Sequence, residues 1–507
     1  MTPPAVAEKR VKTTGKSDEI DPSLRKQLLL LTFIRCLRTA LLAPPPILVP
    51  FYQNSCTLES SAILWLGSWY SALAAICEMP SGVISDILGR RFTLQLAFVG
   101  LGTCWIVTYA SSISSSAVIW LGLAQLLRAI GSSLYSGTDM ALLYELLKKY
   151  NQRPKHSKAN GKSDNDLVLK FESRQVVLST ITEAVVSAFG GLFARSFGES
   201  IVVLMSAVPF LGGAMVCVGL EETTLTTADE AKKEVEISSS NVSNDEWQDV
   251  SNQQKASPPP IPEKTKLIRR RSSRIVTTLN EPSLRIIFGV GVVLNCATYV
   301  ASTGLNPLLW QQVGITNFAG GFLQATNSGM TALGAVMAPT IKGYCSRLSL
   351  NSNSSGTQEL LFALLSTSSV AYGLMTWNAF STTTPASPSS IYTVSTIGAS
   401  WLLSLVRGLA WPVLGSALNA AIGDNGTRAT VLSLFAGAIK LGMVFTGFVL
   451  GYMLHQSSSL GNACALCGAL LLGAALCCLV LFPCPTKSES ADRHENQMND
   501  DSVKKDQ

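Results

Sequence analysis

Apolar runs long enough to cross a membrane recur along the chain, and short polar segments separate them. A transmembrane helix needs about 20 apolar residues, because the hydrocarbon core is roughly 30 Å thick. Helices are the expected form of such runs, since backbone polar groups in lipid must be paired within the segment. The pattern predicts six spans, a long polar break and six more spans, at approximately 28–52, 60–84, 92–112, 117–147, 174–196, 200–220, 284–310, 318–341, 358–378, 391–420, 429–453 and 459–483.

The break and the tails divide the chain into five predicted segments. The break is acidic, then proline-rich, then basic, and a composition this polar predicts a disordered linker rather than a domain. Arg269 to Arg271, followed by Ser272 and Ser273, has the form of a basophilic kinase site. The predicted segments are a cytosolic N-terminal tail (1–26), an N-terminal six-helix bundle (27–220), the cytosolic linker (221–283), a C-terminal six-helix bundle (284–485) and a cytosolic C-terminal tail (486–507).

Composition supports the membrane assignment and excludes several other classes. Of the 507 residues, 47% are hydrophobic and only 14% are charged, whereas soluble domains carry roughly 25% charged residues. The net charge of +6 therefore reflects where Lys and Arg lie relative to the membrane, and no nucleic-acid partner is expected. The twelve cysteines are scattered through apolar segments and the chain has three histidines, so we expect neither a metal site nor a cofactor.

The distribution of basic residues predicts the orientation. If the N-terminus is cytosolic, the loops on that side hold nearly all of the loop Lys and Arg, and the loops on the other side hold only Arg195. Cytosolic loops carry such an excess, so we expect both termini in the cytosol. No signal peptide is recognisable in 1–26, and the plasma membrane is the default location.

A sequence motif between the second and third spans indicates the family. Gly82, Asp86, Gly89, Arg90 and Arg91 stand in the spacing G-x-x-x-D-x-x-G-R-R. This resembles the loop motif of the major facilitator superfamily, at the expected point in the topology. The resemblance implies an all-α fold of twelve transmembrane helices in two six-helix bundles. It also implies a loop that steadies one of two alternating states.

Two further stretches, 78–82 and 136–145, resemble a bacterial-type branch of the superfamily whose substrates are mostly unassigned. The resemblance implies a secondary transporter rather than an enzyme, bound by membrane lipid and working as a monomer. One departure is clear, because the fifth span reads Ser-Ala-Phe-Gly-Gly at 187–191 and lacks the proline of the antiporter motif. An antiport mechanism therefore gains no support.

Two arginines near the middle of the membrane are the strongest candidates for substrate binding. A charged side chain at that depth costs roughly 2.5–3.5 kcal/mol on insertion scales. Arg128 in the fourth span and Arg407 in the tenth occupy matching positions of the two halves. They could hold an anionic substrate from both sides of a central cavity. Alternatively, each pairs with an internal acid and stabilises its own bundle.

Other candidates have less specific signals. Lys440, Arg38 and Trp411 are further possible substrate contacts, and Lys440 could instead pair with an acid. Glu78 and Glu183 suit a proton carrier, because burial favours the protonated form of a carboxyl group, but either could equally be the structural partner of an arginine. We expect Asp139 and Glu145, in the lower part of the fourth span, to serve the inner gate with Arg90 or Arg91.

These observations favour a secondary active transporter that moves a small solute by alternating access. The basic excess among the buried candidates points to an organic or inorganic anion. Proton-coupled efflux of drugs or metabolites is the alternative within the class. A non-transporting receptor or scaffold with the same fold is the alternative from another class. No P-loop and no catalytic motif are present, so neither an ATP-driven pump nor an enzyme is expected.

Overall fold

The computed structural model describes residues 22–151, 164–221, 282–348, 357–381, 390–422, 428–456 and 459–481. Helix forms over each of the twelve predicted apolar runs. Most of the predicted linker, including Ser272 and Ser273, and both tails apart from 22–26 lie outside these residues. By length and hydropathy alone, ten of the described helical segments suffice to cross a membrane.

The N-terminal half begins with a span that is broken in the middle. Its first part ends at Thr39, and helix resumes at Pro45 after the segment 40–44. The proline run at 44–46 explains the break, since proline lacks an N–H and cannot continue a helix. The elements of this half are α1 (Pro22–Thr39), α2 (Pro45–Pro50), the π-helix η1 (Phe51–Ser55), α3 (Ser60–Leu88), α4 (Arg90–Ser111), α5 (Ala117–Asn151), α6 (Asp164–Phe197), α7 (Glu199–Met205) and α8 (Ala207–Cys217).

Neighbouring helices provide hydrogen-bond partners for the break in the first span. The backbone N–H of Ala43 donates to the hydroxyl of Ser206, at 2.9 Å. The hydroxyl of Thr39 donates to the carbonyl oxygen of Ser179 in α6, at 2.9 Å. Irregular backbone at membrane depth is tolerated only where protein groups or water satisfy it. Hydrogen bonds to neighbouring helices therefore stabilise the break, which is not a frayed helix end.

The C-terminal half also has a π-helix in its first span, but within the span rather than at its end. That span is α11 (Pro282–Val300), the π-helix η2 (Ala301–Leu305) and α12 (Asn306–Gln312), which has Pro307 in its first turn. The remaining elements are α13 (Asn317–Leu348), α14 (Thr357–Ser381), α15 (Ser390–Ile422), α16 (Arg428–His455) and α17 (Leu460–Leu481).

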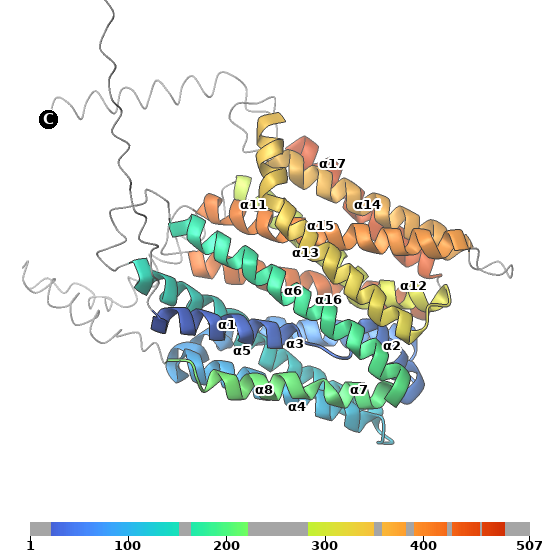
Figure 1. The fold of residues 1–507 in the computed structure, drawn as a ribbon. Coiled ribbons are helices and arrows are strands. Elements are labelled where there is room, and N and C mark those ends of the chain that lie inside the picture. Colours follow the sequence, from blue (N-terminus) through green and yellow to red (C-terminus); the bar gives the residue numbers. More distant parts are fainter. Residues whose placement is uncertain are drawn as a thin grey trace, which may run out of the picture.

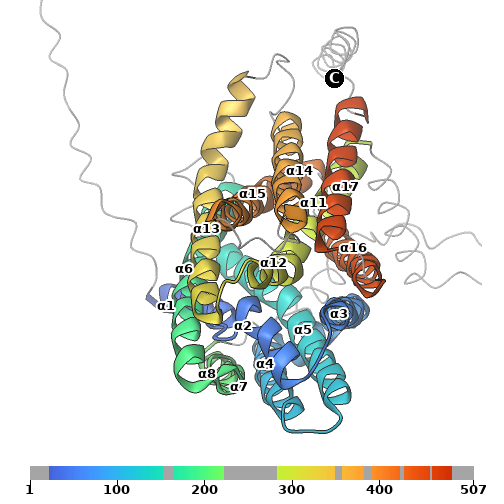
Figure 2. The ribbon, with the colours of Figure 1, turned by 90° about the vertical axis from the view of Figure 1, so that its right-hand side faces the viewer.

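The two halves lie side by side and meet along two seams (Figures 1 and 2). In the first seam α3 packs against α16, and in the second α6 packs against α13. We call the end of the molecule where α1 begins the proximal end. The opposite end, where α3 begins and α16 finishes, is the distal end. A rocking motion of one half against the other would turn about these seams.

Close helix contacts hold the distal part of both seams. In the first seam the indole of Trp65 lies 5.5 Å from the imidazole ring of His455, centroid to centroid. In the second seam a Cβ at Gly321 would lie only 2.7 Å from the Cα of Gly191. Helices in membranes approach this closely only where small residues face each other. The halves are therefore packed together at the distal end.

We expect Gly321→Ala to destabilise this arrangement. The added methyl group would overlap Gly191 backbone, and overpacking of this kind costs typically about 1–3 kcal/mol. Thermal unfolding of the detergent-purified protein should show a lower transition temperature. Gly329→Ala is the matched control, because it lies on the same helix and a Cβ there meets nothing within 4 Å. Equal transition temperatures for the two variants would contradict the predicted close contact.

Candidate functional site

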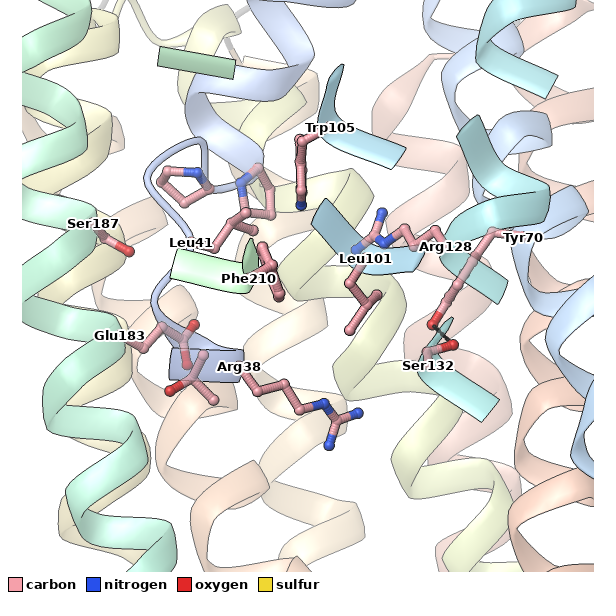
Figure 3. A pocket seen from close by; sticks show the side chains of 13 residues that line it. Arg38, Leu41, Tyr70, Leu101, Trp105, Arg128, Ser132, Glu183, Ser187 and Phe210 are labelled. Atoms are coloured by element: carbon pink, nitrogen blue, oxygen red, sulfur yellow. Dashed lines mark hydrogen bonds between the residues drawn. The ribbon is translucent and has the colours of Figure 1, made fainter. Parts of the chain in front are cut away.

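A cavity of about 190 Å³ opens in the N-terminal half, beside the break in the first span (Figure 3). Its wall combines guanidinium groups, aromatic rings and one carboxylate. Small-molecule sites have this character, apolar with a few placed polar groups. The lining residues are Arg38, Thr39, Leu41, Pro44, Pro45, Tyr70, Leu101, Trp105, Arg128, Ser132, Glu183, Ser187 and Phe210.

Aromatic rings position the guanidinium group of Arg128. Its central carbon lies 4.8 Å from the centroid of the Tyr70 ring and 5.9 Å from that of the Trp105 ring. Cation–π attraction acts over this range and strengthens where water is excluded. The Tyr70 hydroxyl is in turn bonded to the hydroxyl of Ser132, at 3.2 Å (Figure 3). Two rings from α3 and α4 therefore hold Arg128 of α5 at the cavity wall.

The charge of Arg128 has no carboxylate partner among the described residues. Its electrostatic neighbours include three phenol groups, those of Tyr70, Tyr299 and Tyr52. Neutral dipoles compensate a buried cation only partly, and such a charge is costly when it remains unpaired. The sequence leaves open whether Arg128 binds an anion or forms a structural ion pair, and no such pair with a described carboxylate is present.

Arg407 of the other half is exposed and does not line this cavity, but it shares an electrostatic neighbour with Arg128. It donates from Nη1 to the hydroxyl of Ser302 in η2, at 3.2 Å. The phenol of Tyr299, one turn earlier in α11, interacts electrostatically with both Arg407 and Arg128. The two arginines thus share one neighbour. Each also lies near the π-helix of its own half, Arg128 by Tyr52 of η1 and Arg407 by Ser302 of η2.

Arg38 also lines the cavity, from the end of α1. Its guanidinium carbon lies 4.1 Å from the centroid of the Tyr135 ring. One turn earlier, Arg35 forms an ion pair with Asp139, with 3.1 Å between Nε and Oδ2. This pair ties α5 to α1, and the gate expected between Asp139 and Arg90 or Arg91 stays a prediction.

The carboxylate of Glu183 belongs to both the cavity and the second seam. It lines the cavity from α6 (Figure 3). Its Oε1 atom accepts a hydrogen bond from Nε2 of Gln324 in α13, at 3.3 Å. Glu183 forms no ion pair with a described Lys or Arg. A contact between the two halves therefore includes a group that can face a bound solute.

Glu78 and Lys440 form an ion pair across the first seam. The Oε1 atom of Glu78 accepts a hydrogen bond from the hydroxyl of Ser136, at 2.6 Å. The side chains of Glu78 and Lys440 are only 11% and 19% exposed. The sequence leaves open whether Lys440 contacts a solute or pairs with an acid. The structure has the acid pair, and the acid, Glu78, belongs to the other half of the molecule.

The motif loop forms a tight turn between α3 and α4. Gly89 adopts φ +86°, a region that favours glycine. Arg90 donates from Nη1 to the hydroxyl of Ser85, at 2.9 Å. The side chains of Asp86 and Glu145 lie outside the described residues, as does any detail of the surroundings of Gly82.

Trp411 differs from the other candidates. Its side chain is 56% exposed and does not line the cavity. The residues that sequence reasoning missed are mainly aromatic or small polar residues within the spans: Tyr70, Trp105, Tyr299, Ser136, Ser302 and Gln324. A Tyr or Trp in an apolar run gives no signal of its own, because such residues pack equally well as core.

No protein-family model matches the sequence, and no curated protein matches it either. Solved structures do match, along nearly the whole chain. A variant of the nucleoside transporter NupG is 12% identical, with a TM-score of 0.62 over 91% of this chain and 100% of that one. A POT family transporter in complex with 5-aminolevulinic acid is 14% identical, with a TM-score of 0.60 over 92% of this chain and 97% of that one. At these identities the likeness is one of fold.

Proposed function

We propose that this chain, which has the fold of the major facilitator superfamily, is a secondary transporter of a small solute that carries an anionic group. The all-α fold of two bundles predicted from the sequence is confirmed. The solute would bind at the cavity beside the broken first span. Rocking of the two halves about their seams would then expose it to one side of the membrane and the other in turn.

The unpaired charge of Arg128 carries this proposal. Rings fix the guanidinium at the wall of the cavity, and no described carboxylate neutralises it. A carboxylate or phosphate ligand would supply the missing charge and could accept two parallel hydrogen bonds. Arg407 would bind the same anionic group from the other half, because both arginines interact electrostatically with Tyr299. A scaffold that does not bind solute would have no need of such a charge.

The similar structures support a small solute without specifying it. They include a nucleoside transporter, and POT family transporters holding 5-aminolevulinic acid or a thioalcohol-conjugated peptide. The cavity of about 190 Å³ is smaller than the roughly 300–1,000 Å³ of drug-sized sites. This size favours metabolites of a few heavy atoms over bulky drugs.

The orientation of the proposed transporter follows from the charge of its loops. With the N-terminus in the cytosol, the proximal end is cytosolic and the distal end faces outward. The packed distal seams then correspond to an inward-facing state. Proton-coupled efflux remains the second candidate, and the Glu78–Lys440 pair favours it, because protonation of Glu78 would break a charged contact between the halves.

Thermal stabilisation by matched acids and esters tests the proposal. We expect small carboxylates or phosphate to raise the unfolding temperature of the purified full chain, since a ligand that binds only the folded state stabilises it. Methyl esters of the same carboxylic acids should have little effect. Proteoliposomes should then take up the stabilising anion. Equal stabilisation by acids and esters would contradict an anion site, and binding without any flux would favour a receptor or scaffold.

A further inference from the structure

Opposite charges face the same cavity. Arg128 projects from α5 and Glu183 from α6, and both line the space beside the broken first span. In Figure 3 they stand on opposite sides of the view, with Leu41, Leu101 and Phe210 between them. An apolar floor with a cation at one side and an anion at the other is an electrically polarised site.

The two charges do not neutralise each other or, among the described residues, pair with any other charged group. Glu183 has one oxygen bonded to the neutral amide of Gln324, which compensates a carboxylate only in part. Other carboxylates at this depth do find cations, as the pairs Glu78–Lys440 and Arg35–Asp139 show. Glu183 thus differs from Glu78 and Asp139, which each have a cation within ion-pair distance, while Arg128 and Arg38 both line the cavity without an ion pair to a described carboxylate.

We infer that the transported solute carries an ammonium group as well as an anionic group. The inference rests on the proposed function and adds the second charge. The anionic group would bind to Arg128, and the ammonium group would donate to the free oxygen of Glu183. Arg38 at the same cavity leaves one positive charge in excess, which would favour a further acidic group on the solute.

An ammonium group bound at Glu183 would also affect how the two halves pack together. Glu183 is bonded through Gln324 to α13 of the other half. An ammonium group at Glu183 would compete for the same carboxylate or share it. Binding at the cavity would therefore alter a contact between the two halves. A solute shifts the populations of two conformations only if it interacts differently with each of them.

A series of matched probes tests the inference. The purified full chain is titrated with β-alanine, 4-aminobutanoate, 5-aminopentanoate and 6-aminohexanoate, and with the same acids lacking the amine. We expect one amino acid of the series to bind about tenfold or more tightly than its deaminated counterpart, as a charge-assisted hydrogen bond supplies. Glu183→Gln should abolish that difference without weakening the binding of the plain acid, because it removes a like charge from the cavity. Glu199→Gln, which alters an acid that does not line the cavity, should preserve it.

The outcomes separate this inference from the proposed function. Plain acids that bind as tightly as the amino acids, and lose binding in Arg128→Gln, would overturn the ammonium site while the carrier stands. The absence of any Arg128-dependent binding would reject both. An amino-acid preference that survives Glu183→Gln would overturn the assigned role of Glu183. If that variant does not fold, Glu183→Asp provides the test, because a carboxylate one carbon shorter must shift the preferred probe to a longer chain.

Discussion

Arg128→Gln should lower the affinity for the anionic solute by about 10- to 100-fold. A hydrogen bond to a charged group contributes about 1.5–3 kcal/mol, and the charge of Arg128 stands unpaired in a frame of two aromatic rings. Arg128→Lys should also bind poorly, because an ammonium group neither stacks on Tyr70 as a plane nor offers a two-pronged donor. Titration by thermal shift and uptake into proteoliposomes measure both losses.

The stability of the unliganded variant distinguishes binding from a structural role. Removing an uncompensated charge from a partly apolar site should leave the unfolding temperature of unliganded Arg128→Gln unchanged or higher. A structural arginine would instead lower it. Arg174→Gln, on the exposed surface of α6, is the control for the loss of a positive charge. Retained anion binding in Arg128→Gln would remove the main support for the proposed carrier.

Lys440→Met should destabilise the protein by about 3–5 kcal/mol. The change leaves the carboxylate of Glu78 in the seam without its cation, and breaking one side of a buried pair carries a cost of that order. The double variant Glu78→Gln with Lys440→Met should recover most of the loss, because no bare charge then remains. Denaturation of the single and double variants in detergent gives the coupling energy directly.

The ion pair within one half is the matched control for this cycle. Arg35 and Asp139 join α1 to α5, and their side chains are 11% and 9% exposed. Replacing both Arg35 and Asp139 should change the free energy of unfolding but leave the distance between the two halves unchanged. Removing both Glu78 and Lys440 should also broaden the distance distribution between labels at Ser115 and Gln456, at the distal ends of the two halves. An identical distribution in both double variants would contradict a bridging role for the first pair.

The spans and the broken helix could be predicted from the sequence, because their causes are local. Long apolar runs have no alternative to helix in lipid, and three consecutive prolines at 44–46 interrupt one wherever they stand. Arg128 and Arg407 were also predictable, since a deep charge is costly enough to need a reason. Their depth follows from position along a span alone.

The partners of these charges could not be predicted. Glu78 and Lys440 stand 362 positions apart, and nothing local indicates that α3 and α16 bring them together. The same holds for Gln324, which reaches Glu183 only because α13 packs on α6. The choice between a binding charge and a structural pair depends on such distant contacts. Sequence reasoning had to leave it open for Lys440, Glu78 and Arg128 alike.

Each half has a π-helix in its first span, η1 at the end of that span and η2 between α11 and α12. A π-turn accommodates one residue more than an α-turn, and in an α-helix each residue adds about 1.5 Å of rise and about 100° of rotation. A change from π to α at η2 would therefore rotate α12 and shift it along its axis, whereas η1 ends its span and is followed only by the connection to α3. Because η2 lies beside Arg407 through Ser302, the rotation of α12 would depend on whether a solute binds that arginine.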